Sequence, residues 1–293
     1  MRKITAIILL LIISVTLVFS QDYKFEKSSF IYKEIDGISL EMTMYKPQVS
    51  SNVRLPAIVF FFGGGWVGGD PSHFELQAEY LATRGMVAFC PDYRTQSRHS
   101  TTPFESVMDA KSAIRYLKTH SYELGIDSGK IVASGGSAGG HLAACTAVIK
   151  NINEATDDLS VSSVPRALVL FNPVLDTGKK GYGREKLDGR EFELSPVHHI
   201  TASVPTTAIM HGMADKTVPY ENAVRFNYLM KQQGNKSVLL GYKKQDHGFF
   251  NYSRSPKYFK KTLSKTETFL EEQGLLRGES WLNEYCKTLA KKK

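Results

Sequence analysis

A glycine-rich turn after an apolar run constrains the fold of this chain more than any other feature. Residues 135–139 read Gly-Gly-Ser-Ala-Gly, and the mostly apolar residues 130–134 come directly before them. The apolar run predicts a buried strand, and the segment from Ala138 to Ile149 predicts a helix. A serine on such a sharp strand-to-helix turn presents its hydroxyl above a sheet, near the unpaired first amides of the helix. The pattern therefore predicts that Ser137 is a nucleophile, although an ordinary tight connection with an inert serine would also produce it.

The hydrophobic pattern of the rest of the chain predicts alternating strands and helices. The predicted strands span residues 30–35, 38–45, 56–62, 86–90, 130–134, 167–171, 206–210 and 237–241. The predicted helices span residues 74–83, 103–120, 138–149, 220–233, 258–273 and 281–289. Asp36-Gly37 is a strong signal for a hairpin between the first two strands. This order predicts an α/β fold with a mostly parallel, eight-stranded sheet and helices on both faces.

Two segments fall outside this alternation. Arg2 and Lys3 precede an apolar run that ends near Phe19, which predicts a secretory signal peptide over residues 1–20. An uncleaved anchor is the alternative, but the run is short for a membrane span. We expect residues 21–293 to form one domain, secreted or periplasmic, without stable membrane insertion after cleavage. Residues 172–202 predict a lid-like insertion, with a loose surface excursion as the alternative.

The charge and the cysteine content indicate which kinds of binding partner and cofactor we can expect. The formal net charge is +8, but the lysines and arginines are not interleaved with aromatic residues as on a nucleic-acid platform, so we expect no nucleic acid. Cys90, Cys145 and Cys286 cannot all pair internally, and the first two are predicted to be small buried core residues. No metal-ligand spacing is present, and we expect neither a metal nor a cofactor. The sequence leaves the oligomeric state open.

Ser137 would need a base and an orienting acid, and the chain offers candidates for both. Asp215 follows the strand that is predicted over residues 206–210, and His247 follows the last predicted strand. Since the carboxyl ends of parallel strands meet at one edge, we expect Ser137, Asp215 and His247 to form a triad. Asp215 would otherwise be a helix N-cap, and His247 an idle loop histidine. Competing or neighbouring candidates are Asp176, Asp188, His141, His198, His199 and His211, of which His141 is expected to pack and His198 and His199 could line a cleft.

Three consecutive glycines are candidates for the loop that stabilises the oxyanion. Attack on an ester carbonyl creates an oxyanion, and glycines let backbone N–H groups approach it closely. Residues 63–65 are all glycine and follow a predicted strand. We expect the oxyanion to be bound by the amides of Gly64, Gly65 and Ala138; a merely flexible loop is the alternative.

With these residues in place, the chain resembles the α/β-hydrolase superfamily. Phe62-Gly63-Gly64-Gly65-Trp66 together with the turn around Ser137 resembles the hormone-sensitive-lipase-related branch, nearest to acetyl-xylan and feruloyl esterases, and residues 92–94 (Asp-Tyr-Arg) match a supporting motif of that branch. The resemblance implies the triad given above. The family usually has histidine where this chain has Phe62, so support for the loop must come from packing of Phe61, Phe62 or Trp66.

These observations favour a secreted serine carboxylesterase that removes short acyl groups, with acetyl the first candidate. The expected substrate is a small-molecule or glycan ester, cleaved through an acyl-enzyme. An exopeptidase of the prolyl-oligopeptidase type would share the fold and the triad. A catalytically inactive binding protein on this fold is the other alternative.

Overall fold

The computed structural model describes residues 24–48 and 53–291, in which the strands form one sheet of order β1-β2-β4-β3-β5-β6-β7-β8. The strands are β1 (Phe25–Ile35), β2 (Ile38–Pro47), β3 (Leu55–Phe61), β4 (Val87–Pro91), β5 (Ile126–Gly136), β6 (Ala167–Phe171), β7 (Thr206–Gly212) and β8 (Ser237–Tyr242). β1 pairs with β2, and β2 with β4, in antiparallel fashion; every other pair is parallel. The mostly parallel, eight-stranded sheet predicted from the sequence is confirmed.

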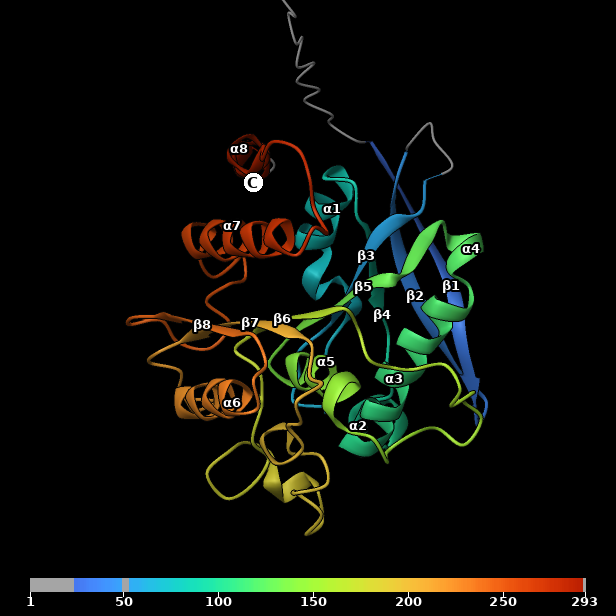
Figure 1. The fold of residues 1–293 in the computed structure, drawn as a ribbon, viewed down its shortest axis with the longest axis vertical. Coiled ribbons are helices and arrows are strands. Elements are labelled where there is room, and N and C mark those ends of the chain that lie inside the picture. Colours follow the sequence, from blue (N-terminus) through green and yellow to red (C-terminus); the bar gives the residue numbers. More distant parts are fainter. Residues whose placement is uncertain (1–23, 49–52, 292–293) are drawn as a thin grey trace, which may run out of the picture.

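Helices cover both faces of this sheet. They are α1 (Glu75–Thr83), α2 (Gln96–His99), α3 (Pro103–Thr119), α4 (Ser121–Leu124), α5 (Ala138–Val148), α6 (Tyr220–Gln232), α7 (Pro256–Glu272) and α8 (Leu282–Lys291), with short 3-10 turns η1 (Pro71–Phe74), η2 (Arg184–Lys186) and η3 (Pro196–His198). Figure 1 shows α3, α5 and α6 on one side of the sheet, and α1, α7 and α8 on the other. The sheet thus has two hydrophobic cores: the first lies against α3, α5 and α6, and the second against α1, α7 and α8. Side chains of β3 alternate between them, since Val59 lies in the first core and Phe60 in the second.

Most differences from the predicted boundaries have local causes. The hairpin at Asp36-Gly37 is present, with φ of 50° and 75° at its two central residues. β1 begins at Phe25 rather than at residue 30, because its first residues pair with β2 while several polar side chains face solvent. α7 begins at Pro256 rather than at residue 258, because Ser255 caps it by accepting from the Tyr258 amide.

The insertion over residues 172–202 is packed against the domain. It contains only η2 and η3 as regular structure, yet Leu187, Glu191 and Leu194 are buried. Figure 1 places it below α5 and α6, on the side of the sheet that carries the first core. Buried side chains therefore anchor its loops next to the sheet's helices, where they can line a neighbouring cavity.

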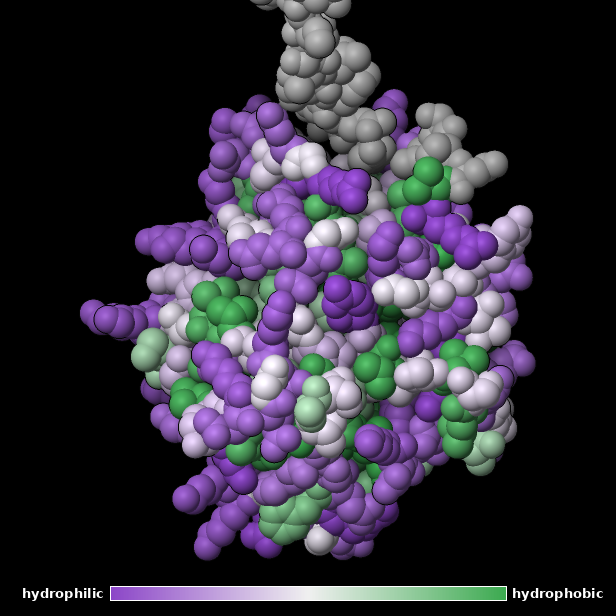
Figure 2. Space-filling model, viewed as in Figure 1, coloured by the Kyte–Doolittle hydropathy of each residue, from purple (hydrophilic) through white to green (hydrophobic). Residues whose placement is uncertain are grey.

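The predicted signal peptide over residues 1–20 lies outside the described residues. Among residues 24–48 and 53–291, no helix has the length and apolar character needed to cross a membrane. Figure 2 shows hydrophilic residues over most of one face of the molecule, with hydrophobic residues in small separate groups.

Candidate active site

Ser137 lies on a strained turn between β5 and α5. Its backbone has φ 56° and ψ −121°, a conformation that a non-glycine residue adopts only where the surroundings enforce it. The neighbouring glycines make the turn possible, because a Cβ on Gly135 would lie 2.4 Å from the Gly139 oxygen. A Cβ on Gly139 would lie 2.1 Å from the Phe61 oxygen. The serine is thus fixed at the carboxyl end of β5, at the first turn of α5.

The structure brings the three predicted triad residues together. His247 Nε2 lies 2.9 Å from Ser137 Oγ, and His247 Nδ1 lies 2.7 Å from Asp215 Oδ2. Asp215 follows β7 and His247 follows β8, so each side chain reaches the site from the carboxyl end of its strand. The distances suit proton transfer from the serine to the imidazole, with the carboxylate orienting the ring.

Asp215 is held as a carboxylate. Its side chain is fully buried, and Oδ1 accepts from the amides of Thr217 and Val218. Burial by itself would raise the pKa of Asp215, but hydrogen bonds from His211 and His247 outweigh it and hold that pKa well below its ordinary value. Asp215, ionised at neutral pH, can accept from His247 Nδ1 and leave Nε2 free to act on Ser137.

The competing candidates contact other partners. Asp176 bonds to Arg225 at 2.7 Å, and Asp188 is exposed in the insertion. His211 is buried, with Nε2 3.3 Å from Asp215 Oδ2 and 3.0 Å from the Val218 oxygen, so it supports the acid. His141 packs as expected: its Nε2 lies 2.7 Å from the Leu194 oxygen, and burial lowers its pKa to about 4.

The glycine loop lies beside the serine. Gly63, Gly64 and Gly65 line the same cavity as Ser137 and His247, whereas Ala138 is buried directly behind the serine as the first residue of α5. Gly64 and Gly65 have φ of 144° and 63°, and a Cβ on Gly64 would lie 2.0 Å from the Gly68 oxygen. Any side chain at position 64 would clash with this oxygen, so the loop requires glycine there.

Phe62, which stands where the family usually has histidine, is held by Tyr93. The two rings stack with centroids 4.0 Å apart, and the Tyr93 hydroxyl donates to the Phe62 carbonyl oxygen at 2.9 Å. Tyr93 is anchored in turn by its neighbours, since Asp92 pairs with Arg98 and Arg94 pairs with the buried Asp109. Residues 92–94 therefore hold the loop in place from behind.

The cavity over Ser137 measures about 300 Å³. Its lining includes residues that sequence patterns offered little reason to select: His73, Asn172, Tyr182, Asn251 and Arg254. Tyr182 comes from the insertion, so the segment after β6 contributes to the cavity over Ser137. Asn251 and Arg254 follow His247 closely in sequence, which is the one signal that could have pointed to them.

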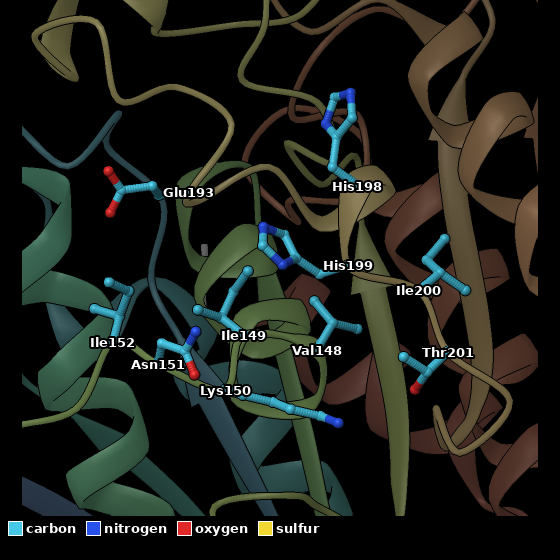
Figure 3. Close-up of a pocket in the computed structure, with 10 residues that line it drawn as sticks. All are labelled: Val148, Ile149, Lys150, Asn151, Ile152, Glu193, His198, His199, Ile200 and Thr201. Atoms are coloured by element: carbon cyan, nitrogen blue, oxygen red, sulfur yellow. The ribbon is translucent and has the colours of Figure 1, made fainter.

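His198 and His199 line a different cavity. It measures about 370 Å³ and lies between the end of α5 and the insertion, with Val148, Ile149 and Ile152 among its apolar lining (Figure 3). It shares no lining residue with the cavity over Ser137. Of the described residues, no group of histidine, cysteine or acidic side chains is arranged to hold a metal ion.

The sheet, its helices and the site at the carboxyl ends of the strands define an α/β-hydrolase. A BD-FAE family model matches residues 42–177. The structure is similar to Thermogutta terrifontis esterase 2 phosphoramylated by tabun, at a TM-score of 0.83 and 45% identity, covering 86% of this chain and 97% of that one. The same esterase with propionate bound matches at a TM-score of 0.81 and 43% identity, covering 88% and 97% of the two chains. The chain belongs to the α/β-hydrolase serine esterases of the hormone-sensitive-lipase-related type.

More distant relatives are also esterases. A probable isoprenylcysteine alpha-carbonyl methylesterase of Arabidopsis thaliana is 28% identical over 230 residues, covering 70% of this chain and 48% of that protein. An acetylxylan esterase of Xylanibacter ruminicola is 27% identical over 231 residues, covering 73% and 44%. The chain spans about half the length of the curated relatives it matches.

Proposed function

We propose that this chain is an exported serine carboxylesterase that removes short acyl groups, acetyl first among them, from a carbohydrate or another small ester. The observation that carries the proposal is the hydrogen-bonded chain from Ser137 through His247 to Asp215, with distances of 2.9 and 2.7 Å. The related Thermogutta esterase is phosphoramylated by tabun, and covalent modification of that kind is the behaviour expected of an activated nucleophile.

The reaction proceeds in two halves. Ser137 Oγ attacks the ester carbonyl carbon while its proton passes to His247 Nε2, and the resulting oxyanion is stabilised by the amides of Gly64, Gly65 and Ala138. The carbon–oxygen bond to the alcohol then breaks, and His247 gives its proton to the leaving oxygen. Water attacks the acyl-enzyme with His247 as base, which releases the carboxylic acid and restores the Ser137 hydroxyl.

The size of the cavity favours a short acyl group. A volume of about 300 Å³ is at the lower end for ligand pockets, and residues such as Phe250, Tyr182 and Asn172 occupy its walls. A relative of similar structure has been observed with propionate, and another is an acetylxylan esterase. We propose further that the insertion over residues 172–202 acts as a lid, with Tyr182 as its contact to the substrate, and that residues 1–20 direct export.

The proposal is tested by hydrolysis of p-nitrophenyl acetate, butyrate and octanoate by the wild type and by Ser137→Ala. We expect kcat/KM to fall from acetate or butyrate to octanoate, and Ser137→Ala to be inactive on all three. Acetylated xylan and a dipeptide amide extend the series to a glycan and to a peptidase substrate. Wild-type rates in Ser137→Ala, or cleavage of the amide alone, would overturn the proposal. Mass spectrometry of the exported protein tests the signal, since an intact Met1 would contradict cleavage.

A further inference from the structure

We propose that His73 and Asn251 form a brace that fixes the glycine loop beside Ser137, which makes His73 a positioning residue for oxyanion stabilisation. His73 lies in η1, and Asn251 lies four residues after His247. Neither residue belongs to the triad or supplies an expected oxyanion donor. The inference rests on the proposed esterase activity, because a brace for the oxyanion loop has a function only if an oxyanion forms.

The hydrogen bonds of His73 define its state. The Gly63 amide donates to His73 Nδ1 at 3.0 Å, so Nδ1 must be unprotonated. The proton of the neutral ring is then on Nε2, which lies 2.9 Å from Asn251 Oδ1 and donates to it. Only one tautomer of the neutral ring satisfies both bonds, and the doubly protonated ring cannot accept from Gly63.

The braced glycine lies between His73 and the nucleophile. A Cβ on Gly63 would lie 3.3 Å from His73 Cε1 and 3.4 Å from Ser137 Cβ. The His73 ring is itself confined, with ring centroids of Phe74 and Phe250 at 4.8 and 5.9 Å. A shift of Gly63 would therefore carry Gly64 and Gly65 with it and change their distance from the carbonyl attacked by Ser137.

This brace and the Tyr93 contact act on neighbouring groups of the loop. Tyr93 binds the Phe62 carbonyl oxygen at 2.9 Å, and His73 binds the Gly63 amide in the next residue. Because Phe62 offers no side-chain hydrogen bond, these two contacts supply the polar support that a histidine at this position would otherwise give. The histidine that supports the loop in this chain is therefore His73, ten residues after Gly63.

The surroundings keep His73 neutral. Burial lowers the pKa of His73 most strongly, the hydrogen bond to Asn251 opposes that effect, and the positive charge of protonated His247 lowers it further. Arg254 lines the same cavity. Asp70 lies in the same turn, but its carboxylate accepts from the Ser72 amide. His73 thus remains an acceptor for Gly63 at neutral pH.

His73→Phe tests the brace, and His99→Phe is the matched control. Phenylalanine keeps a ring in place but removes both hydrogen bonds. His99 also accepts a backbone amide on Nδ1, that of Thr95 at 3.1 Å, but does not line the cavity. On p-nitrophenyl acetate we expect His73→Phe to lose about 10- to 100-fold in kcat with KM within about threefold, because oxyanion stabilisation acts only in the transition state. We expect His99→Phe to remain within about twofold of the wild type.

Asn251→Asp supplies a readout that packing alone would not change. A carboxylate next to Nε2 favours the doubly protonated His73 ring, which cannot accept from Gly63. We expect the pKa of His73, followed by NMR, to rise by about one unit and kcat to fall as His73 becomes doubly protonated, with wild-type kcat recovered at alkaline pH. This variant changes one amide to a carboxylate of the same size, so it decides the question if His73→Phe fails to fold.

The two proposals fail in different ways. If the wild type hydrolyses the ester while His73→Phe keeps its kcat, or while Asn251→Asp keeps an unchanged pH profile, the brace is overturned and the esterase stands. A wild type that hydrolyses no ester overturns the esterase and the brace with it.

Discussion

The two sides of Ser137 are built on different principles. On one side, His247 and Asp215 form a chain of side-chain hydrogen bonds that ends on a buried carboxylate. On the other side, the glycine loop presents backbone, held by contacts from His73 and Tyr93 to single main-chain atoms. In the reaction that we propose, the first side performs the proton transfers and the second fixes the positions of the oxyanion donors. Damage to the triad side should therefore abolish turnover, while damage to the loop side should reduce it in graded steps.

His247→Ala is expected to have the largest effect on the triad side. Without a base, Ser137 is a weak nucleophile, so kcat should fall by roughly 10⁴-fold or more. His120→Ala is the control, because the His120 ring stacks on Tyr116, with centroids 4.1 Å apart, and lies outside the cavity. Steady-state hydrolysis of p-nitrophenyl acetate measures both. A loss of less than about tenfold in His247→Ala would show that another group is the base.

Asp215→Asn should cost slightly less. The amide can donate to His247 Nδ1 and so favour the wrong tautomer, which should lower kcat by about 10³- to 10⁴-fold. His211 cannot replace the carboxylate, because its Nε2, 3.3 Å from Asp215 Oδ2 and 3.0 Å from the Val218 oxygen, donates a hydrogen bond and cannot accept one from His247 Nδ1. Activity within about tenfold of the wild type would contradict the role of Asp215.

The same substitution carries a prediction on pH and stability. The folded state lowers the pKa of Asp215, so the ionised form contributes stability above the ordinary aspartate pKa, and this contribution is lost as the pH falls toward the lowered value. The amide that replaces the carboxyl group in Asp215→Asn does not ionise. The free energy of unfolding of the wild type relative to Asp215→Asn should therefore decrease between about pH 5 and pH 3, measured by urea denaturation. A difference independent of pH would show that Asp215 is not stabilised as a carboxylate.

Gly64→Ala sharpens the comparison on the loop side. The added Cβ would lie 2.0 Å from the Gly68 oxygen, so the loop must move, and we expect kcat to fall by about 10²-fold or more. Gly274→Ala is the matched control: it also has positive φ, at 69°, but a Cβ there meets nothing within 4 Å. Gly274→Ala should lose about 1 kcal/mol of stability and keep its turnover. Equal kinetic losses in the two variants would indicate general destabilisation.

Tyr93→Phe is the smallest of these changes. It removes only the hydroxyl that donates to the Phe62 oxygen and keeps the stacked ring. We expect a loss of about 3- to 10-fold in kcat and about 1–2 kcal/mol of stability, because the carbonyl is left unpaired in a buried position. Tyr122→Phe, at a residue that is 77% exposed, should change neither quantity. If Tyr93→Phe lost as much kcat as His247→Ala, the two sides of Ser137 would not differ in the way proposed.

The sequence predicted the triad and the glycines, but not the side chains that hold the glycine loop. The triad side was predictable, because parallel strands place the residues that follow them at one edge, and Ser137, Asp215 and His247 each follow a strand. The glycine loop was predictable as well, because residues 63–65 are three consecutive glycines that directly follow a predicted strand.

The brace was not predictable from the sequence. His73 lies in a short 3-10 turn and Asn251 in a loop, and both have residue types that are common in such places. Their contact spans 178 positions and depends on how η1 packs against the loop after β8. The extra residues at the start of β1 were missed for a related reason: their polar side chains face solvent, so no apolar pattern marks them.

Covalent labelling tests the central claim most directly, since every step above begins with the oxygen of Ser137. The wild type is treated with a fluorophosphonate, and the modified peptide is identified by mass spectrometry. The account predicts one label per chain, on Ser137, with complete loss of ester hydrolysis and no label in Ser137→Ala. A label on another residue that abolishes hydrolysis, or full hydrolysis by a chain labelled at Ser137, would contradict it.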